Sequence, residues 1–209
     1  MKNTKYNINK IFTIFLQQNP NPTTELVYNS EFELLIAVVL SAQSTDIMVN
    51  KVTKELFKQY NTPQKIFELG DDKLKDYIKT IGLFNTKAEN IIKLCFKLIN
   101  DFDSKVPNNF EDLISLAGVG RKTANVILNT LYGTNDIAVD THVYRVSHRI
   151  GLSDSSDLKK LEQDLYITIP EKYQKNAHHW LILHGRYTCV ARTPKCDVCL
   201  INQYCLSRN

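Results

Sequence analysis

The chain has 209 residues, of which 43% are hydrophobic, and contains only seven glycines and six prolines. This length allows a large buried core, and the scarcity of loop-forming residues predicts a compact, helix-rich protein. The net charge of +4 permits a polyanionic partner without requiring one. The longest apolar run, Leu34 to Leu40, is far shorter than the roughly 20 residues that cross a bilayer. The stretch Ile11 to Leu16 lacks a small-residue cleavage site, so we expect a soluble, cytoplasmic protein without a membrane partner.

Apolar residues recur at helical spacing along nearly the whole chain, and no segment alternates convincingly like a strand. The first stripe belongs to a short N-terminal helix that needs a partner, and we expect it to pack on the C-terminal part. The stripes are Ile8, Ile11, Phe12 and Phe15; Phe32, Leu35, Ile36, Val39 and Leu40; Phe110, Leu113, Ile114 and Leu116; and Ala124, Ile127, Leu128 and Leu131.

Helix boundaries can also be predicted. Ser30 and Thr45 precede helical patterns as N-caps, and Pro63 follows Thr62 at a first helical position. Gly133 ends the pattern that begins after residue 120, where glycine can take a left-handed conformation. We therefore predict an all-α protein of two packed helical subdomains with a cleft between them. Residues 24–134 form a central bundle, and residues 1–23 with 135–209 form the second subdomain.

One cysteine stands apart from the others. Cys95 lies in the apolar frame of Ile91, Ile92, Leu94 and Leu98. Because a free thiol packs as a small hydrophobe, we predict an inert core residue.

The segment from Leu116 to Arg121 predicts a hairpin between two helices, with Gly118 and Gly120 on either side of Val119. Glycine tolerates positive φ and lets another backbone approach closely. The amides and the dipole at the start of the second helix would form an anion site suited to a phosphate. The alternative is a tight connection that binds nothing.

Lys122 follows the hairpin directly, and Arg121 and Thr123 flank it. A lysine at this place is either a phosphate contact or a nucleophile. As a nucleophile the amine must be neutral, and both Arg121 and the positive end of the helix favour the neutral form. The residues alone leave both interpretations open.

Asp140 is a lone acid in an apolar frame. The commonest role for such an aspartate is a helix N-cap, and the helix through Val143 and Val146 would supply the amides. A capping carboxylate at a cleft could also stabilise a developing positive charge and help to move protons.

Cys189, Cys196, Cys199 and Cys205 are separated by gaps of six, two and five residues. Clustered cysteines do not fit a secreted disulfide framework, whereas four thiolates hold either Zn²⁺ or an iron–sulfur cluster. Arg192 and Lys195 lie between the first two ligands, and a rigid basic loop there suits a phosphate contact. We expect the aromatic residues of the preceding segment, His178 to Tyr187, to pack around the metal site.

Together, the hairpin with its lysine, the segment Val139 to His142 and the cysteine spacing resemble the endonuclease III family of base-excision DNA glycosylases. The resemblance covers essentially the whole chain. The hairpin begins Leu-Ala where family members commonly have Leu-Pro, which should affect loop stiffness more than chemistry. The resemblance implies a helix-hairpin-helix motif in the central bundle and a [4Fe–4S] cluster bound by the four cysteines.

The same resemblance assigns roles to individual residues. Lys122 is the nucleophile and Asp140 the catalytic carboxylate. Gln43 and Leu83 match segments that penetrate the duplex, where a base taken out of the stack leaves a gap to fill. His142 matches a residue that lines the pocket. The remaining expected DNA contacts are Gly118, Gly120, Arg121, Thr123, Arg192 and Lys195.

These roles predict a bifunctional base-excision enzyme that removes oxidised pyrimidines through a lysine Schiff base. The enzyme would then cleave the strand 3′ to the abasic site by β-elimination. We expect damaged double-stranded DNA as its partner, a monomer, and no obligate protein partner. One alternative is a monofunctional mismatch glycosylase, whose family members lack the lysine. The other is a non-enzymatic DNA clamp that uses the hairpin and the cluster only for binding.

Overall fold

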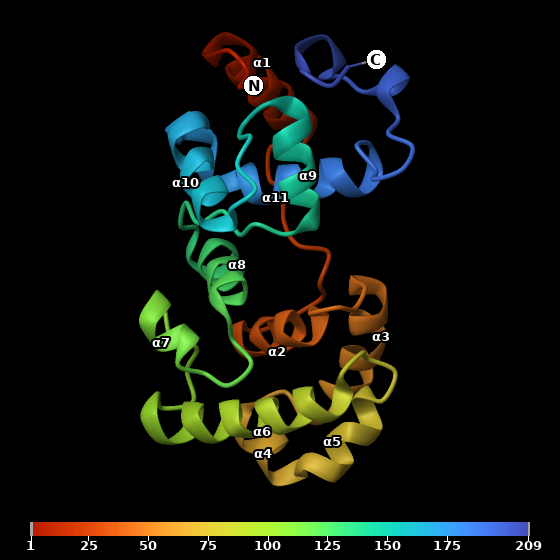
Figure 1. Cartoon of the computed structure of the whole chain (residues 1–209). Coiled ribbons are helices and arrows are strands. Elements are labelled where there is room, and N and C mark those ends of the chain that lie inside the picture. The colour runs from red at the N-terminus through yellow and green to blue at the C-terminus, as the bar shows by residue number, and fades with distance from the viewer. Residues whose placement is uncertain (1, 209) are drawn as a thin grey trace. The chain divides into compact units, whose positions relative to one another are not determined.

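A computed structural model describes residues 2–208 of the chain (Figure 1). Within this range the regular structure is entirely helical, with no strand. The predicted all-α fold is confirmed. No helix in the described range is long and apolar enough to cross a membrane.

The described chain divides into two compact units. One unit comprises residues 25–132, which we call the central unit. The other comprises residues 2–24 together with 133–208, which we call the cysteine unit. The predicted limits, residues 24 and 134, lie next to these divisions.

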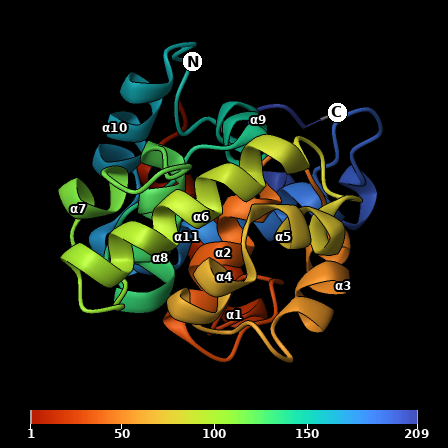
Figure 2. The same ribbon diagram turned by 90° about the horizontal axis from the view of Figure 1, so that it is seen from below.

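The central unit is built around α2 (Glu31–Ser41), in which every residue from Phe32 to Leu40 is buried. All of these residues except Glu33 are apolar, as a helix surrounded on all sides requires. Helix α8 contacts α2 and α7, whereas α4 and α5 lie against the long helix α6 (Figure 2). The other helices of this unit are α3 (Asp46–Leu56), α4 (Pro63–Leu69), α5 (Asp71–Ile78), α6 (Phe84–Asp101), α7 (Phe110–Ile114) and α8 (Arg121–Tyr132).

The predicted helix boundaries in this unit are confirmed. The side chains of Ser30, Thr45 and Thr62 accept hydrogen bonds from the backbone N–H groups three residues on, at 3.1, 3.3 and 3.3 Å. Pro63 is the first residue of α4. Helix α8 ends at Tyr132, directly before Gly133, whose φ is +64°.

Cys95 is completely buried in the core beside α2 and α6 residues. Burial raises the pKa of its thiol to about 12, so the group stays protonated. The prediction of an inert core thiol is confirmed.

In the cysteine unit, α11 (Glu171–Tyr187) packs against α9 (Thr141–Ile150), and α1 (Lys5–Gln18) packs on α11 and on the C-terminal turn η2 (Asn202–Tyr204). The predicted stripe Ile8, Ile11, Phe12 and Phe15 is buried there, which confirms that the N-terminal helix returns to the C-terminal part. Two further elements complete the unit, α10 (Leu158–Thr168) and the short helical turn η1 (Cys196–Val198).

Candidate functional site

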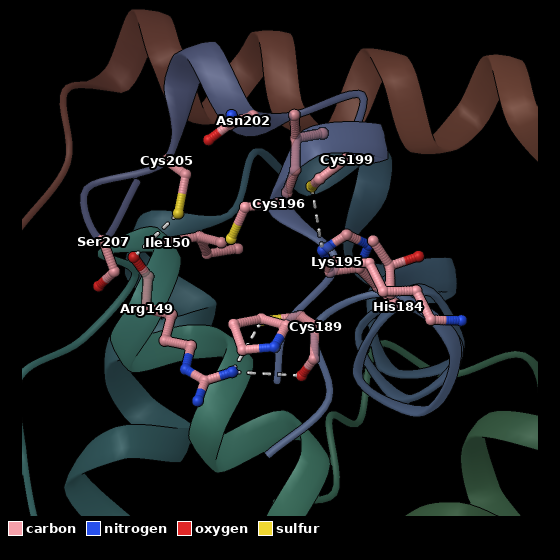
Figure 3. A pocket seen from close by; sticks show the side chains of 13 residues that line it. Arg149, Ile150, His184, Cys189, Lys195, Cys196, Cys199, Asn202, Cys205 and Ser207 are labelled. Atoms are coloured by element: carbon pink, nitrogen blue, oxygen red, sulfur yellow. Dashed lines mark hydrogen bonds between the residues drawn. The ribbon is translucent and has the colours of Figure 1, made fainter. Parts of the chain in front are cut away.

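The four C-terminal cysteines surround one cavity of about 220 Å³ in the cysteine unit. Figure 3 shows their sulfur atoms directed toward this common space. Cys189 follows the end of α11, whereas Cys196 opens η1 and Cys205 follows η2. None of the four is in a disulfide. Short turns between the ligands therefore bring four thiols to one place, as the sequence spacing predicts.

The size of the cavity suits an iron–sulfur cluster. Zn²⁺ holds its thiolates at about 2.3 Å. Four thiols around a space of about 220 Å³ have room for a larger, multi-iron group. The donor set is also right, because thiolates are the usual ligands of iron–sulfur clusters.

Two arginines of α9 hold the loop that begins with Cys189 in place through hydrogen bonds. Arg149 donates to the carbonyl oxygens of Val190 and Ala191, both at 2.7 Å, and lies 3.4 Å from the Cys189 sulfur. Arg145 donates to the carbonyl oxygens of Gly185 and Cys189 at 2.8 and 3.0 Å. Neither arginine is predictable from the sequence, because an arginine on an amphipathic helix has no sequence feature that separates it from a surface residue.

The prediction that the aromatic residues of α11 pack around the metal site is wrong for Trp180. Of the aromatic side chains in this segment, His184 lines the cavity, with its Nε2 atom 3.8 Å from the Cys199 sulfur. Trp180 packs against Phe12 and Phe15 of α1 and donates to the carbonyl oxygen of Asn19 at 2.8 Å. Trp180 and His184 lie on the same face of α11, and Phe15 of α1 contacts both rings. Trp180 is one turn farther from the C-terminal end of α11, so it packs on α1 and does not line the cavity.

Burial lowers the pKa of His179 and of His184 to about 4. Burial therefore favours the neutral form of both rings. His178 is buried against the His179 ring, with its Nδ1 atom 3.0 Å from the carbonyl oxygen of Ala138.

Arg192 and Lys195 are exposed on the loop between the first two cysteines. The backbone N–H of Lys195 donates to the carbonyl oxygen of Thr188 at 2.9 Å, which closes the loop at its base. Two cations thus stand on a loop held at both ends.

In the central unit, the predicted hairpin joins α7 and α8. The side chains of Leu116 and Val119 are buried and anchor the hairpin in the core. Between them, Gly118 has a left-handed backbone with a φ of +80°. The backbone conformation favours glycine here, and a Cβ atom would also stand only 3.2 Å from the Asn90 Cβ atom, a tight contact. Nothing lies within 4 Å of a Cβ built on Gly120, where the backbone is open to a ligand.

Lys122 is exposed in the first turn of α8, and Thr123 is half-buried next to it. The guanidinium of Arg121 lies 5.3 Å from the centre of the Phe110 ring, a cation–π contact that joins α8 to α7. The structure therefore puts an amine at the positive end of the α8 dipole.

Asp140 caps α9, as predicted. Its Oδ1 atom accepts hydrogen bonds from the backbone N–H groups of His142 and Val143, both at 2.8 Å. The Nδ1 atom of His142 lies 3.2 Å from Nη2 of Arg145. Because a guanidinium can only donate, this ring nitrogen accepts and the proton is on Nε2. The His142 ring is thereby fixed in orientation.

Helices α9 and α11 approach closely beside His142. A Cβ atom on Gly185 would stand 2.9 Å from the His142 Cβ atom. This glycine was not among the predicted site residues. A sequence signal for it existed, since glycine inside a helical pattern costs about 1 kcal/mol and commonly marks close packing.

Gln43 and Leu83 share an unusual feature. Both are exposed and both have a left-handed backbone, with φ of +56° and +59°. Non-glycine residues in this region cost about 1–3 kcal/mol and are concentrated at functional sites. Gln43 lies in the turn between α2 and α3, and Leu83 is the N-cap of α6.

Residues 36–170 match the family described as HhH-GPD superfamily base excision DNA repair protein. The chain belongs to this superfamily. Residues 189–205 match the iron–sulfur binding domain of endonuclease III. The resemblance drawn from the sequence is confirmed, and the protein carries a [4Fe–4S] cluster. The matched iron–sulfur domain spans the four cysteines of the cavity.

Known proteins match this chain in sequence and in structure over nearly its whole length. Endonuclease III of Rickettsia felis is 59% identical over 95% of this chain and 93% of its own length. Endonuclease III of Escherichia coli K12 is 51% identical over 94% and 93% of the two chains. A solved structure of a trapped endonuclease III–DNA covalent intermediate superimposes with a TM-score of 0.90 at 43% identity, covering 98% of this chain and 96% of that chain. This HhH-GPD protein is accordingly an enzyme, a DNA glycosylase with AP lyase activity.

Proposed function

We propose that the enzyme removes oxidised pyrimidines from double-stranded DNA and cleaves the strand through a Schiff base on Lys122. The observation that carries the proposal is the exposed Lys122 in the first turn of α8, directly after the hairpin. The trapped covalent intermediate of a 43% identical endonuclease III supports a covalent route.

In the first step the neutral amine of Lys122 attacks C1′ of the damaged nucleotide. The glycosidic bond breaks, and its electron pair leaves with the base, which takes up a proton. The sugar opens to give an imine between Lys122 and C1′. Loss of a proton from C2′ then expels the 3′ phosphate, so the C3′–O bond breaks by β-elimination. Water hydrolyses the imine and releases the lysine.

The other residues support this step. Asp140 stabilises the positive charge that develops on the sugar, and His142 beside it lines the pocket. Gly118, Gly120, Arg121 and Thr123 hold the phosphate backbone at the start of α8, where amides and the helix dipole favour an anion. Arg192 and Lys195 contact further phosphates. Gln43 and Leu83 enter the duplex when the base leaves the stack.

When bound, the cluster would link the four cysteine side chains and so stabilise the fold of this segment. Arg145 and Arg149 hold the loop that begins with Cys189. That loop carries Arg192 and Lys195, which are exposed. The enzyme acts as a monomer and needs no obligate protein partner. It is located in the cytoplasm, where it associates with the nucleoid through DNA.

The test is borohydride trapping on a duplex oligonucleotide with one thymine glycol. We expect a covalent protein–DNA adduct and a nick 3′ to the lesion, because borohydride reduces the imine. Base release without adduct or nick would contradict the lyase and indicate a monofunctional glycosylase. Tight binding without any base release would indicate another damaged base as substrate.

Asp140 offers a second test, because its capping and catalytic roles respond differently to substitution. Asp140→Asn keeps an oxygen that can accept from the amides of α9, and asparagine caps about as well as aspartate. We expect an unchanged melting temperature but a loss of base excision of about 10²- to 10⁴-fold. Asp140→Ala should lose the same activity and also about 0.5–2 kcal/mol of stability. Equal excision by wild type and Asp140→Asn would limit the residue to capping.

A further inference from the structure

Lys87, in the first turn of α6, has a buried side chain, with 6% of its surface exposed. Its Nζ atom donates to the carbonyl oxygens of Leu40 at 2.8 Å and Ala42 at 2.5 Å. None of the ion pairs found between residues 2 and 208 includes this lysine. Burial lowers its pKa. A cation is thus buried against two backbone carbonyls, an arrangement that costs more than an apolar side chain of the same length.

The two carbonyls belong to the end of α2, the helix at the centre of the unit. The last carbonyls of a helix have no partner within the helix, and the negative end of its dipole lies there. Neighbouring carbonyls are satisfied locally, since Val38 accepts from the Ser41 hydroxyl and Ser41 accepts from the Ser44 amide. Lys87 satisfies Leu40 and Ala42 from another helix, and so fixes the position of the turn that begins with Ala42.

That turn carries Gln43, and the turn before α6 carries Leu83. The backbone N–H of Lys87 donates to the carbonyl oxygen of Leu83 at 3.0 Å. A Cβ atom on Gly82 would stand 3.3 Å from the carbonyl oxygen of Gln43, so the two turns lie against each other and the glycine permits the contact. Lys87 is therefore bonded to one turn through its backbone and to the other through its side chain.

We infer that Lys87 is a positioning residue that locks the Gln43 turn to the Leu83 turn, so that both side chains enter the DNA as one rigid unit. The inference rests on the proposed function, in which these two residues open the duplex. This role accounts for the buried charge, because the three N–H donors of the Lys87 ammonium can bind two carbonyls that diverge from the end of a helix. It also explains how two strained left-handed residues persist, since strain requires surroundings that over-determine it.

The variant that tests this is Lys87→Met, which keeps the length and apolar stem but removes the donors. Its matched control is Lys93→Met on the same helix, where the lysine is exposed. We expect Lys87→Met to release thymine glycol from a fully paired duplex about 10- to 100-fold more slowly under single-turnover conditions, because misplacing a group slightly has effects of this size. Lys93→Met should match wild type.

A second substrate separates positioning from general damage to the fold. A thymine glycol in a single strand needs no duplex opening, so Lys87→Met should process it at the wild-type rate. A 2-aminopurine opposite the lesion should also show less unstacking with Lys87→Met than with wild type. An equal loss on single-stranded and paired substrates, or paired-duplex activity equal to that of Lys93→Met, overturns the inference. Failure of wild type itself on both substrates would instead contradict the proposed function.

If Lys87→Met does not fold, Gly82→Ala tests the same lock from the other side. The added methyl group presses on the Gln43 carbonyl and leaves Lys87 intact. We expect the same preference for single-stranded over paired substrate, and no such preference would overturn the inference.

Discussion

Lys122→Ala abolishes the borohydride-trapped adduct and lowers strand cleavage by roughly a thousandfold or more, the scale seen when a covalent nucleophile is removed. The side chain is exposed in the first turn of α8 and has no role in the core. Alanine is a good helix former, so the melting temperature should change little. The measurement is gel detection of the adduct and of the nick on a thymine glycol duplex.

The control for this experiment is Lys93→Ala, an exposed lysine of the same unit that has no place in the proposed reaction. It should form adduct like wild type. Binding of Lys122→Ala to duplex DNA at moderate salt should weaken only slightly, since one phosphate contact at most is lost. An adduct that persists in Lys122→Ala would show that another amine is the nucleophile.

Cys199→Ala should lose the cluster and unfold the C-terminal segment. Residues 189–205 contain only two short helical turns, and of their side chains only Cys189 and Ile201 are buried. Such a segment cannot supply enough apolar burial to order itself, so metal binding supplies its folding free energy. We expect loss of bound iron and sulfide, loss of the brown colour, and a decrease in stability of several kcal/mol.

The effect should extend to the N-terminal helix, because α1 packs on η2 and the Asn3 side chain donates to the carbonyl oxygen of Tyr204 at 2.6 Å. Trypsin should then cut after Arg192 or Lys195, at sites that the intact loop protects. Limited proteolysis and metal analysis measure the two results.

The matched control is Cys95→Ala, which removes the thiol buried in the central unit. This variant should lose some stability through the small cavity it creates but retain full iron and sulfide. Zinc in place of iron in anaerobically prepared wild type would contradict the cluster. A full iron content in Cys199→Ala would contradict the role of that ligand.

The sequence by itself determined the features that depend on neighbouring residues. Helical periodicity predicted the all-α fold, and the caps at Ser30, Thr45 and Thr62 marked helix starts, because capping involves residues within one turn. The cysteine spacing predicted the metal site, since the four ligands lie on one short segment joined by tight turns. The hairpin placed Lys122 at the start of α8 for the same local reason.

Only the tertiary structure decided which distant residues support those sites. Arg149 reaches the Cys189 loop, Gly185 admits His142, and Lys87 joins the ends of α2 and α6. Trp180 packs on α1 instead of the cysteines. The physical reason is that periodicity and spacing describe how one segment folds on itself. Contacts between segments far apart in the chain depend on how whole helices pack. A glycine inside a helix, such as Gly185, indicates close packing without identifying its partner, and no local signal marks Arg149 or Lys87.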